Sequence, residues 1–268
     1  MITRIEKQRV LDNIKDKEVK MLVSNILDKA IRFDKTENPY CSSFLNINEF
    51  NTVKSILNHF NIRYYTFYGN KDCEKVNIAF IPGYLQENIN EFFENNICCI
   101  KIISKSKGKL LHKDYMGAIY SLGVKREYIG DIILKDDVAY FFCLNCIKDY
   151  FLLNLTSVGK YSVITAQVNI FSKEVDGLAL NLVKKEYIVP SYRIDAILSE
   201  VYNLSRSETK DKILNGDLYI NDKNIFYPNT MVNENDIVSF KRCGKIKIGN
   251  EIRKTRNSNI VLCIYKYS

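Results

Sequence analysis

The sequence predicts an α+β protein with more than one domain. Its 268 residues are 46% apolar and 12% aromatic, which is enough for about two hydrophobic cores at roughly 100–200 residues per domain. The apolar residues follow a helical period near the N-terminus, then alternate between strand and helix patterns, and end in two short helices and several short strands. We therefore expect an N-terminal α/β region at 1–82, a central domain at 83–182 and a C-terminal domain at 183–268.

The N-terminal region predicts helices followed by a small sheet. Apolar residues in 5–34 and 48–60 repeat at the i, i+3, i+4 spacing of a buried helix face, and 5–34 is long enough for a helical hairpin. The stretches 62–68 and 76–81 are rich in β-branched and aromatic residues and flank a polar turn at 69–72. These two stretches therefore predict a β-hairpin.

The central region repeats a strand and helix order twice. After a helix at 85–94, the predicted elements are strand 97–103, helix 114–122, strand 129–134, strand 138–144, helix 146–155 and strand 162–170. Two such split halves commonly close into a four-stranded antiparallel sheet backed by two helices. This is the ferredoxin-like arrangement of RNA-recognition motifs, so we expect an RRM-like central domain, although the fold alone does not establish RNA binding.

Positive charge is concentrated in the C-terminal part of the chain. Residues 184–268 hold 15 Lys and Arg against 10 Asp and Glu, so +5 of the total +8 lies in under a third of the length. The regular alternation stops near 184–187, and Pro190 precedes a new helical pattern, so we expect a domain boundary within 180–190. Charge of this sign favours nucleic acid as a partner.

Composition disfavours membrane and secreted proteins. The longest apolar run, 138–144, is far short of the roughly 20 residues that cross a bilayer. The charged N-terminus lacks the apolar segment of a signal peptide, and eight cysteines are too few for a disulfide scaffold. We therefore expect a cytoplasmic protein with reduced thiols.

A first short helix is predicted directly after Arg193. Ile194 and Val201 belong to one apolar stripe, which would dock this helix on a core. Strand patterns follow at 218–220 and 236–240, so we expect the helix to pack against a small sheet. Arg193 would then lie at the rim.

A second helix is predicted to start at Ser205. Ser205 and Glu208 have the Ser-x-x-Glu spacing of a capping box, and Gly216 is placed to end the helix in a left-handed conformation. A helix start carries unpaired N–H groups and about half a positive charge, to which Arg206 adds a full one. Phosphate oxygens suit this position. Other basic residues follow, and their spacing leaves open whether they share one surface: Lys210, Lys212, Lys241, Arg242, Lys245 and Lys247.

Residues 191–240 resemble the S4 (alpha-L) RNA-binding domain. Its pattern of Arg-Leu-Asp, Ser-Arg, Ile or Val before Gly, Val-x-Val-Asn and Gly-Asp-x-Ile is matched by Arg193-Ile194-Asp195, Ser205-Arg206, Ile213 with Gly216, Tyr219-Ile220-Asn221 and Asn235-Asp236-Ile237. The chain departs from it at Ile194, at Asp222 where Gly is usual, and at Asn235. The resemblance implies RNA contacts by Arg193, Ser205, Arg206, Lys210, Lys212, Lys241, Arg242 and Lys245.

Residues 112–132 resemble the signature segment of the YlmH family. These are bacterial proteins with an N-terminal α/β region, a central RNA-binding domain and a C-terminal S4 domain, so the resemblance covers essentially the whole chain. Lys113 replaces the usual Arg, and Cys243-Gly244-Lys245 replaces Phe-Gly-Arg. The segment adds four candidate RNA contacts: His112, Lys113, Lys125 and Arg126.

The family resemblance implies a non-catalytic RNA-binding protein in translation. Its partner would be rRNA, ribosome-bound tRNA or a ribosomal subunit, and by analogy with other small S4-domain proteins it would rescue stalled large subunits. We expect a monomer that binds no cofactor, metal ion or small-molecule substrate and does not associate with a membrane. Two alternatives stay open: a protein–protein adaptor linked to cell division, and an RNA-modifying enzyme.

The sequence gives little support to catalysis. In S4-bearing RNA enzymes the catalytic domain generally follows the S4 domain, but only 28 residues follow Phe240. None of the 11 glycines forms a G-x-G or P-loop motif. Asp136 with Asp137, and Asp114 near Asp131, are paired carboxylates, but nothing in the pattern places a substrate between them.

Several candidates also have plain structural interpretations. Lys125 and Arg126 are typical of a solvated corner between a helix and a strand. We expect Gly117 to serve close packing and Gly123 to end a helix. His112 lies at a predicted helix start, so we expect it to cap the helix or contact phosphate rather than to carry a proton.

The remaining motifs are most simply part of the core. Cys143 and Cys146 have C-x-x-C spacing, but a zinc site needs four ligands and no second pair is suitably spaced. The aromatic run 64–68 has the composition of a half-buried strand as well as of a base-stacking surface, and we favour the strand. His59 closes an apolar helix. Arg193, Arg206 and Lys210 could instead form surface ion pairs with Asp195, Glu208 or Asp211. Such pairs are worth about 0–1 kcal/mol each and would leave the clustering of the basic residues unexplained.

Overall fold

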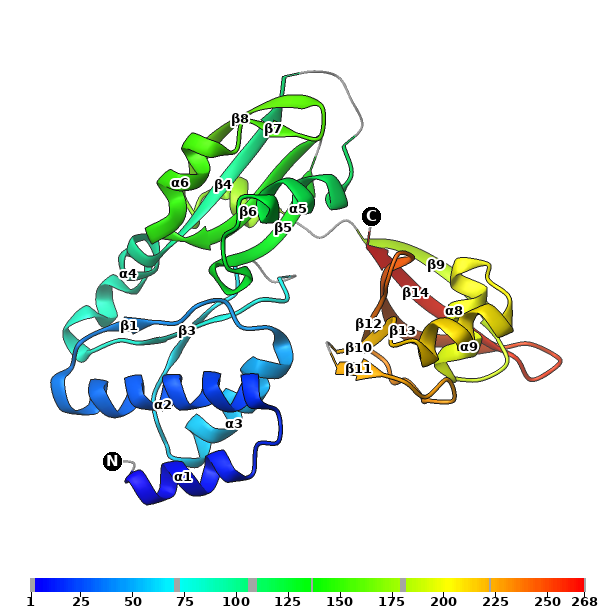
Figure 1. Ribbon diagram of the computed structural model, residues 1–268, viewed down its shortest axis with the longest axis horizontal. Coiled ribbons are helices and arrows are strands. Elements are labelled where there is room, and N and C mark those ends of the chain that lie inside the picture. The colour runs from blue at the N-terminus through cyan, green and yellow to red at the C-terminus, as the bar shows by residue number, and fades with distance from the viewer. Residues whose placement is uncertain are drawn as a thin grey trace. The chain divides into compact units, whose positions relative to one another are not determined.

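The computed structural model describes residues 3–69, 73–105, 110–135, 137–178, 182–221 and 223–267. Helices and sheets are mixed throughout, so the predicted α+β class is confirmed (Figure 1). The chain divides into two compact units, residues 1–180 and 181–268. The N-terminal and central regions therefore lie in one unit.

The N-terminal region has the predicted helices and hairpin. Helices α1 (Arg4–Asp12), α2 (Lys17–Thr36) and α3 (Ile47–His59) pack on a small sheet of β1 (Tyr40–Cys41), β2 (Tyr65–Phe67) and β3 (Asn77–Phe80). The order is β1-β3-β2, and β2 and β3 pair antiparallel as predicted. Strand β1, only two residues long, was not predicted, and predicted turn residues 70–72 lie outside the described ranges.

The central region forms one antiparallel sheet. Its elements are η1 (Gly83–Asn88), α4 (Ile89–Asn96), β4 (Ile97–Ser104), α5 (His112–Ser121), η2 (Arg126–Tyr128), β5 (Ile129–Lys135), β6 (Val138–Leu144), η3 (Asn145–Ile147), α6 (Lys148–Asn154), β7 (Ser157–Val158), β8 (Tyr161–Val168) and α7 (Lys173–Asp176). The strand order is β5-β6-β4-β8-β7. Without the short β7, this is the ferredoxin-like order that the alternation of patterns predicts.

The two faces of the central sheet are both covered. Helices α5 and α6 pack on one face, where Ile100 and Phe141 meet Phe151. On the other face Phe142 packs against Phe67 of β2, with ring centroids 5.9 Å apart. RNA-recognition motifs stack bases on aromatic side chains of their sheet, so the N-terminal region here covers part of the surface that such a mode would use.

The C-terminal unit places two helices on a six-stranded sheet. Its elements are β9 (Leu182–Val189), α8 (Ile194–Tyr202), α9 (Arg206–Leu214), β10 (Leu218–Ile220), β11 (Lys223–Ile225), β12 (Ile237–Phe240), β13 (Gly244–Lys254) and β14 (Ile260–Tyr267). The order is β11-β10-β12-β13-β14-β9. Helices α8 and α9 lie together on one face, where Ile197 and Ile213 pack with Phe240 and Leu262 (Figure 1).

The apolar alternation stops near 184–187, and no strand was predicted there, but the structure has one. Residues Leu182–Val189 form strand β9, which pairs with β14 along its whole length. β9 is an edge strand, and Lys184, Lys185 and Glu186 are exposed on it. Charged side chains are common on edge strands because they discourage further pairing, and here they hide the strand alternation in the sequence.

Among the residues that the structure describes, no helix is both long enough and apolar enough to cross a bilayer.

Candidate nucleic-acid interface

Arg193 stands at the start of α8 and is already engaged within the protein. Its Nε and Nη2 donate to the two carboxylate oxygens of Asp195 at 3.0 and 2.8 Å. Asp195 is only 1% exposed, whereas the Arg193 side chain is 43% exposed. These hydrogen bonds to Asp195 raise the pKa of Arg193 above its ordinary value. The predicted ion-pair alternative is therefore present here, although only two of the five N–H donors of the guanidinium are used.

The first N–H groups of α8 are also occupied. Ile194 donates to the carbonyl of Thr230, Asp195 to that of Pro228, and Ala196 to the side chain of Asp195. Arg193 itself pairs with Met231 through a β-bridge. The start of α8 is therefore closed by the loop before β12 and leaves little room for a phosphate.

The start of α9 differs. Ser205 is its N-cap, and its Oγ accepts a hydrogen bond from the N–H of Glu208 at 3.1 Å, as predicted. The second half of the predicted capping box, from the Glu208 carboxylate back to the Ser205 N–H, does not form between these two described residues, and the Glu208 carboxylate lies 4.0 Å from Lys212 instead. Arg206 is exposed, and its side chain makes no hydrogen bond, ion pair or ring contact with another described residue. The N–H of Glu208 is thus used by Ser205, while those of Arg206 and Ser207 have no partner within the helix, so this start can accept an anion.

The end of α9 carries a second group of basic side chains. Gly216 closes the helix at φ +80°, with the predicted left-handed conformation, and the N–H of Asp217 bonds to the carbonyl of Lys212. Lys241 Nζ lies 3.4 Å from the Gly216 carbonyl oxygen and 3.9 Å from the Asp217 carboxylate. Arg242, beside it, is exposed at φ +62°. Basic side chains therefore lie near both ends of α9.

The structure places Lys210 and Lys245 on different surfaces of the unit. Lys210 is exposed one turn after Arg206 on α9, where residues four apart share a helix face. Lys245 instead lies on β13, next to the inward-facing Ile246, with its Nζ 5.1 Å from the ring centroid of Tyr267. Lys245 therefore belongs to the sheet face opposite α8 and α9.

The four candidates in the central domain lie around α5. His112 begins this helix, and its Nε2 is 3.1 Å from the carbonyl oxygen of Ile132 on β5. Lys113 is exposed beside it, while exposed Lys125 and Arg126 follow the far end of the helix. Ten residues of helix span about 15 Å, so the two pairs are well apart.

Lys125 and Arg126 form the solvated corner described above. Lys125 Nζ lies 4.0 Å from the Glu127 carboxylate, and the Arg126 guanidinium lies 5.2 Å from the ring centroid of Tyr120. Gly123, at φ +75°, ends α5 as predicted. The packing role expected for Gly117 is wrong, because a Cβ there would meet open space.

The rest of the signature segment holds the N-terminal region in place. A Cβ at Gly130 would lie 2.8 Å from both Phe142 and Phe44, so only glycine lets Phe44 pack this closely. Asp131 accepts hydrogen bonds from the backbone N–H groups of Glu74 and Lys75 at 3.0 and 2.8 Å. Sequence reasoning missed these roles, because the partners are more than 50 residues away.

The remaining motifs lie in ordinary structural positions. Cys143 is buried, with its Sγ 3.3 Å from that of Cys98, but Cys146 is exposed, so the core position expected for Cys146 is wrong. His59 packs edge-on against Phe60, and Tyr65 is half-buried in β2, as a strand predicts. The described ranges contain no group of three or more His, Cys, Asp or Glu that could hold a metal ion. Predicted residues Asp136 and Asp222 lie outside those ranges.

Comparison with known proteins supports the resemblance of the central segment. Residues 89–172 match the family model described as "Putative RNA-binding domain in YlmH". This segment is similar to the RNA-binding domain of the YlmH family. The family resemblance that the sequence predicts is thereby confirmed, while the S4-like residues 191–240 lie outside the matched YlmH segment.

Two individual proteins are also similar to this chain. "Ribosome-associated protein quality control protein P2" of Bacillus subtilis (strain 168) is 25% identical over 148 residues, 54% of this chain and 57% of that protein, so the chain spans under two thirds of the relative's length. The solved structure of "Cell division protein ylmH from Streptococcus pneumoniae" is 18% identical, with a TM-score of 0.48, and the match covers 60% of this chain and 97% of that one.

Proposed function

We propose that this protein is a non-catalytic RNA-binding protein that acts on ribosomes. The observation that carries the proposal is the exposed start of α9, where the Arg206 side chain has no partner among the described residues and Lys210 lies one turn away. The YlmH match of the central segment and the name of the Bacillus relative support RNA and the ribosome as partners.

The finer proposal concerns the RNA. Ribosomal RNA or ribosome-bound tRNA is the partner, and rescue of stalled large subunits in the cytoplasm is the process, because the similar Bacillus protein is named for ribosome-associated quality control. The protein works as a monomer without a cofactor. Phosphate contacts of this kind fix position on RNA and carry no sequence information by themselves.

Sedimentation with purified ribosomal subunits tests the proposal. We expect the wild-type protein to travel with subunits in a sucrose gradient, and to be released when the RNA is digested with RNase. We expect Arg206→Ala to weaken this association. Arg256→Ala, which removes the same charge from the exposed β13–β14 turn, is the matched control. A protein that never sediments with either subunit, or that keeps its partners after RNase treatment, would favour the protein–protein adaptor.

A further inference from the structure

The face of the C-terminal sheet opposite α8 and α9 combines tyrosines and lysines. Side chains alternate along its strands, so Ile246 and Leu262 face the helices while their neighbours face away. The outward positions form a cross-strand ladder, in which Lys247 pairs with Tyr265 on β14. Other outward residues of this helix-free face are Tyr219, Lys184, Lys245 and Tyr267.

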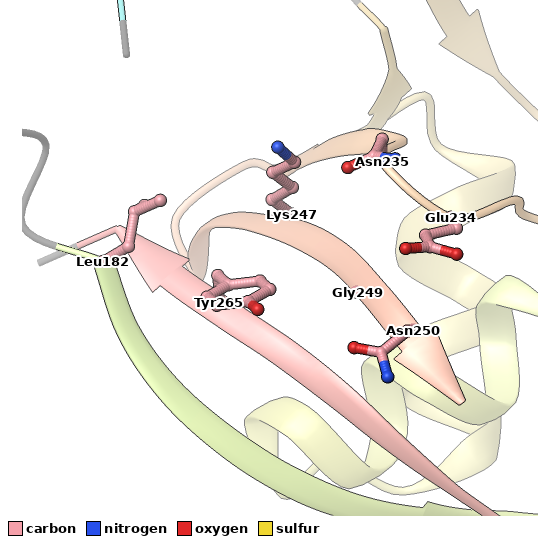
Figure 2. Close-up of a pocket in the computed structure, with 7 residues that line it drawn as sticks. All are labelled: Leu182, Glu234, Asn235, Lys247, Gly249, Asn250 and Tyr265. Atoms are coloured by element: carbon pink, nitrogen blue, oxygen red, sulfur yellow. The ribbon is translucent and has the colours of Figure 1, made fainter. Parts of the chain in front are cut away.

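A pocket of about 180 Å³ opens on the helix-free face. Figure 2 shows Lys247 and Tyr265 on neighbouring strands, with the side chains of Asn235, Glu234 and Asn250 around the same hollow. The pocket therefore combines an aromatic ring, two amides, one ammonium group and one carboxylate.

Two backbone features build this pocket. A Cβ at Gly249 would lie 2.9 Å from Cε2 of Tyr265 and 2.8 Å from the carbonyl oxygen of Cys263, so the glycine lets the ring lie against β13. Asn235 has φ +70°, and its N–H donates to the carbonyl of Ile248 at 2.8 Å. Asparagine tolerates this left-handed conformation better than most residues, and here it places an amide at the pocket.

We infer that this pocket holds an unpaired base of the bound RNA, which makes the helix-free face a second RNA contact of the C-terminal unit. The inference rests on the proposed function. Tyr265 provides a face for base stacking, Asn235 and Asn250 provide hydrogen bonds to a base edge, and Lys247 meets the adjoining phosphate. Glu234 disfavours free phosphate and accepts hydrogen bonds from a base amino group, so the ligand is a nucleotide with such a group rather than a simple anion.

The lysine and tyrosine pairs elsewhere on this face support the same ligand. Lys241 Nζ lies 5.3 Å from the ring centroid of Tyr219, and Lys245 lies similarly close to Tyr267. Positive charge interleaved with aromatic rings is the arrangement by which proteins track single-stranded RNA. The exposed Glu186 reduces the charge of the face, but the lysines outnumber the carboxylates around it.

Binding of an eight-residue cytidine oligonucleotide to the full chain tests the inference. We expect Tyr265→Leu to weaken binding about tenfold, because stacking is lost, and Tyr265→Phe to keep it. Tyr227→Leu is the matched control, since Tyr227 is 73% exposed on a loop of the same unit. Ultraviolet crosslinking should attach the oligonucleotide to the peptide that contains Tyr265.

The outcomes separate this inference from the proposed function. If Tyr265→Leu and Lys247→Gln bind the oligonucleotide like wild type while Arg206→Ala weakens ribosome association, the base pocket is wrong and the function stands. If the wild-type chain binds neither the oligonucleotide nor ribosomal subunits, both the base pocket and the proposed function are wrong. Thermal unfolding of each variant identifies any loss that comes from misfolding, and Lys247→Gln, which leaves the ring in place, then decides the case.

Discussion

The starts of α5 and α9 both carry basic residues that the sequence marks as RNA contacts, but their surroundings differ. Around α5, His112 lies against the backbone of β5, and Gly130 and Asp131 hold the N-terminal region. At the start of α9, Ser205 caps the helix, and the exposed Arg206 side chain has no partner in the described part of the chain. A family motif therefore mixes residues that build the fold with residues that can meet a ligand.

The largest effect is expected where Gly130 packs against Phe44 and Phe142 within residues 1–180. Gly130→Ala should lower the free energy of unfolding by about 2 kcal/mol, because the added methyl overlaps Phe44 and Phe142. Gly117→Ala, where the methyl meets open space, is the control. Urea denaturation measures both, and equal stabilities would show that Gly130 has no packing role.

The next effect concerns RNA affinity. Arg206→Ala should weaken binding to ribosomal RNA about tenfold at low salt, because a charge-assisted contact to phosphate is lost. Its melting temperature should stay at the wild-type value. Filter binding with Arg256→Ala as control measures this, and an equal loss in both variants would mean that only net charge matters.

Arg193 should behave differently from Arg206. Arg193→Ala should lower the melting temperature, because it leaves the buried carboxylate of Asp195 without its charged partner. Calorimetry checks this expectation. A variant with wild-type stability would mean that Asp195 finds another partner, and its RNA affinity would then report on Arg193 alone.

The corner after α5 should contribute less than the start of α9. The double variant Lys125→Ala, Arg126→Ala should change RNA affinity by less than about threefold. Both side chains already have partners, because Lys125 lies near the Glu127 carboxylate and Arg126 lies over the Tyr120 ring. The same filter-binding assay compares it with Arg206→Ala. A larger loss than that of Arg206→Ala would reverse the ranking of the two regions.

The smallest effect is a pH dependence in the first unit. Hydrogen bonds from Lys101 and Tyr140 lower the pKa of Glu174 below its ordinary value of 4.5. This contribution to stability is present at neutral pH and is lost as the pH falls from about 4.5 through the lowered value. Glu174→Gln should therefore lose slightly less stability than wild type between neutral and acid pH, as thermal unfolding would show.

Local signals predicted local structure well. Apolar periodicity located the helices and strands of the central sheet, and Ser205 and Gly216 marked the two ends of α9. These features depend on residues a few positions apart. Strand β9 was missed because its edge position replaces the apolar alternation with charge.

Long-range relations could not be predicted from the same signals. The closing of the α8 start by residues 228–231, and the placement of Lys245 on the opposite sheet face, depend on how strands pair across the unit. The packing of Phe44 against Gly130 depends on chain segments far apart. The spacing of the basic residues therefore indicated candidate RNA contacts but could not predict which of them share a surface.

The salt dependence of RNA binding tests the central claim most directly. If the start of α9 holds RNA phosphate, the plot of log affinity against log salt for Arg206→Ala should be shallower than that of wild type by about one unit, while Arg256→Ala keeps the wild-type slope. Identical slopes for wild type and Arg206→Ala would contradict the claim.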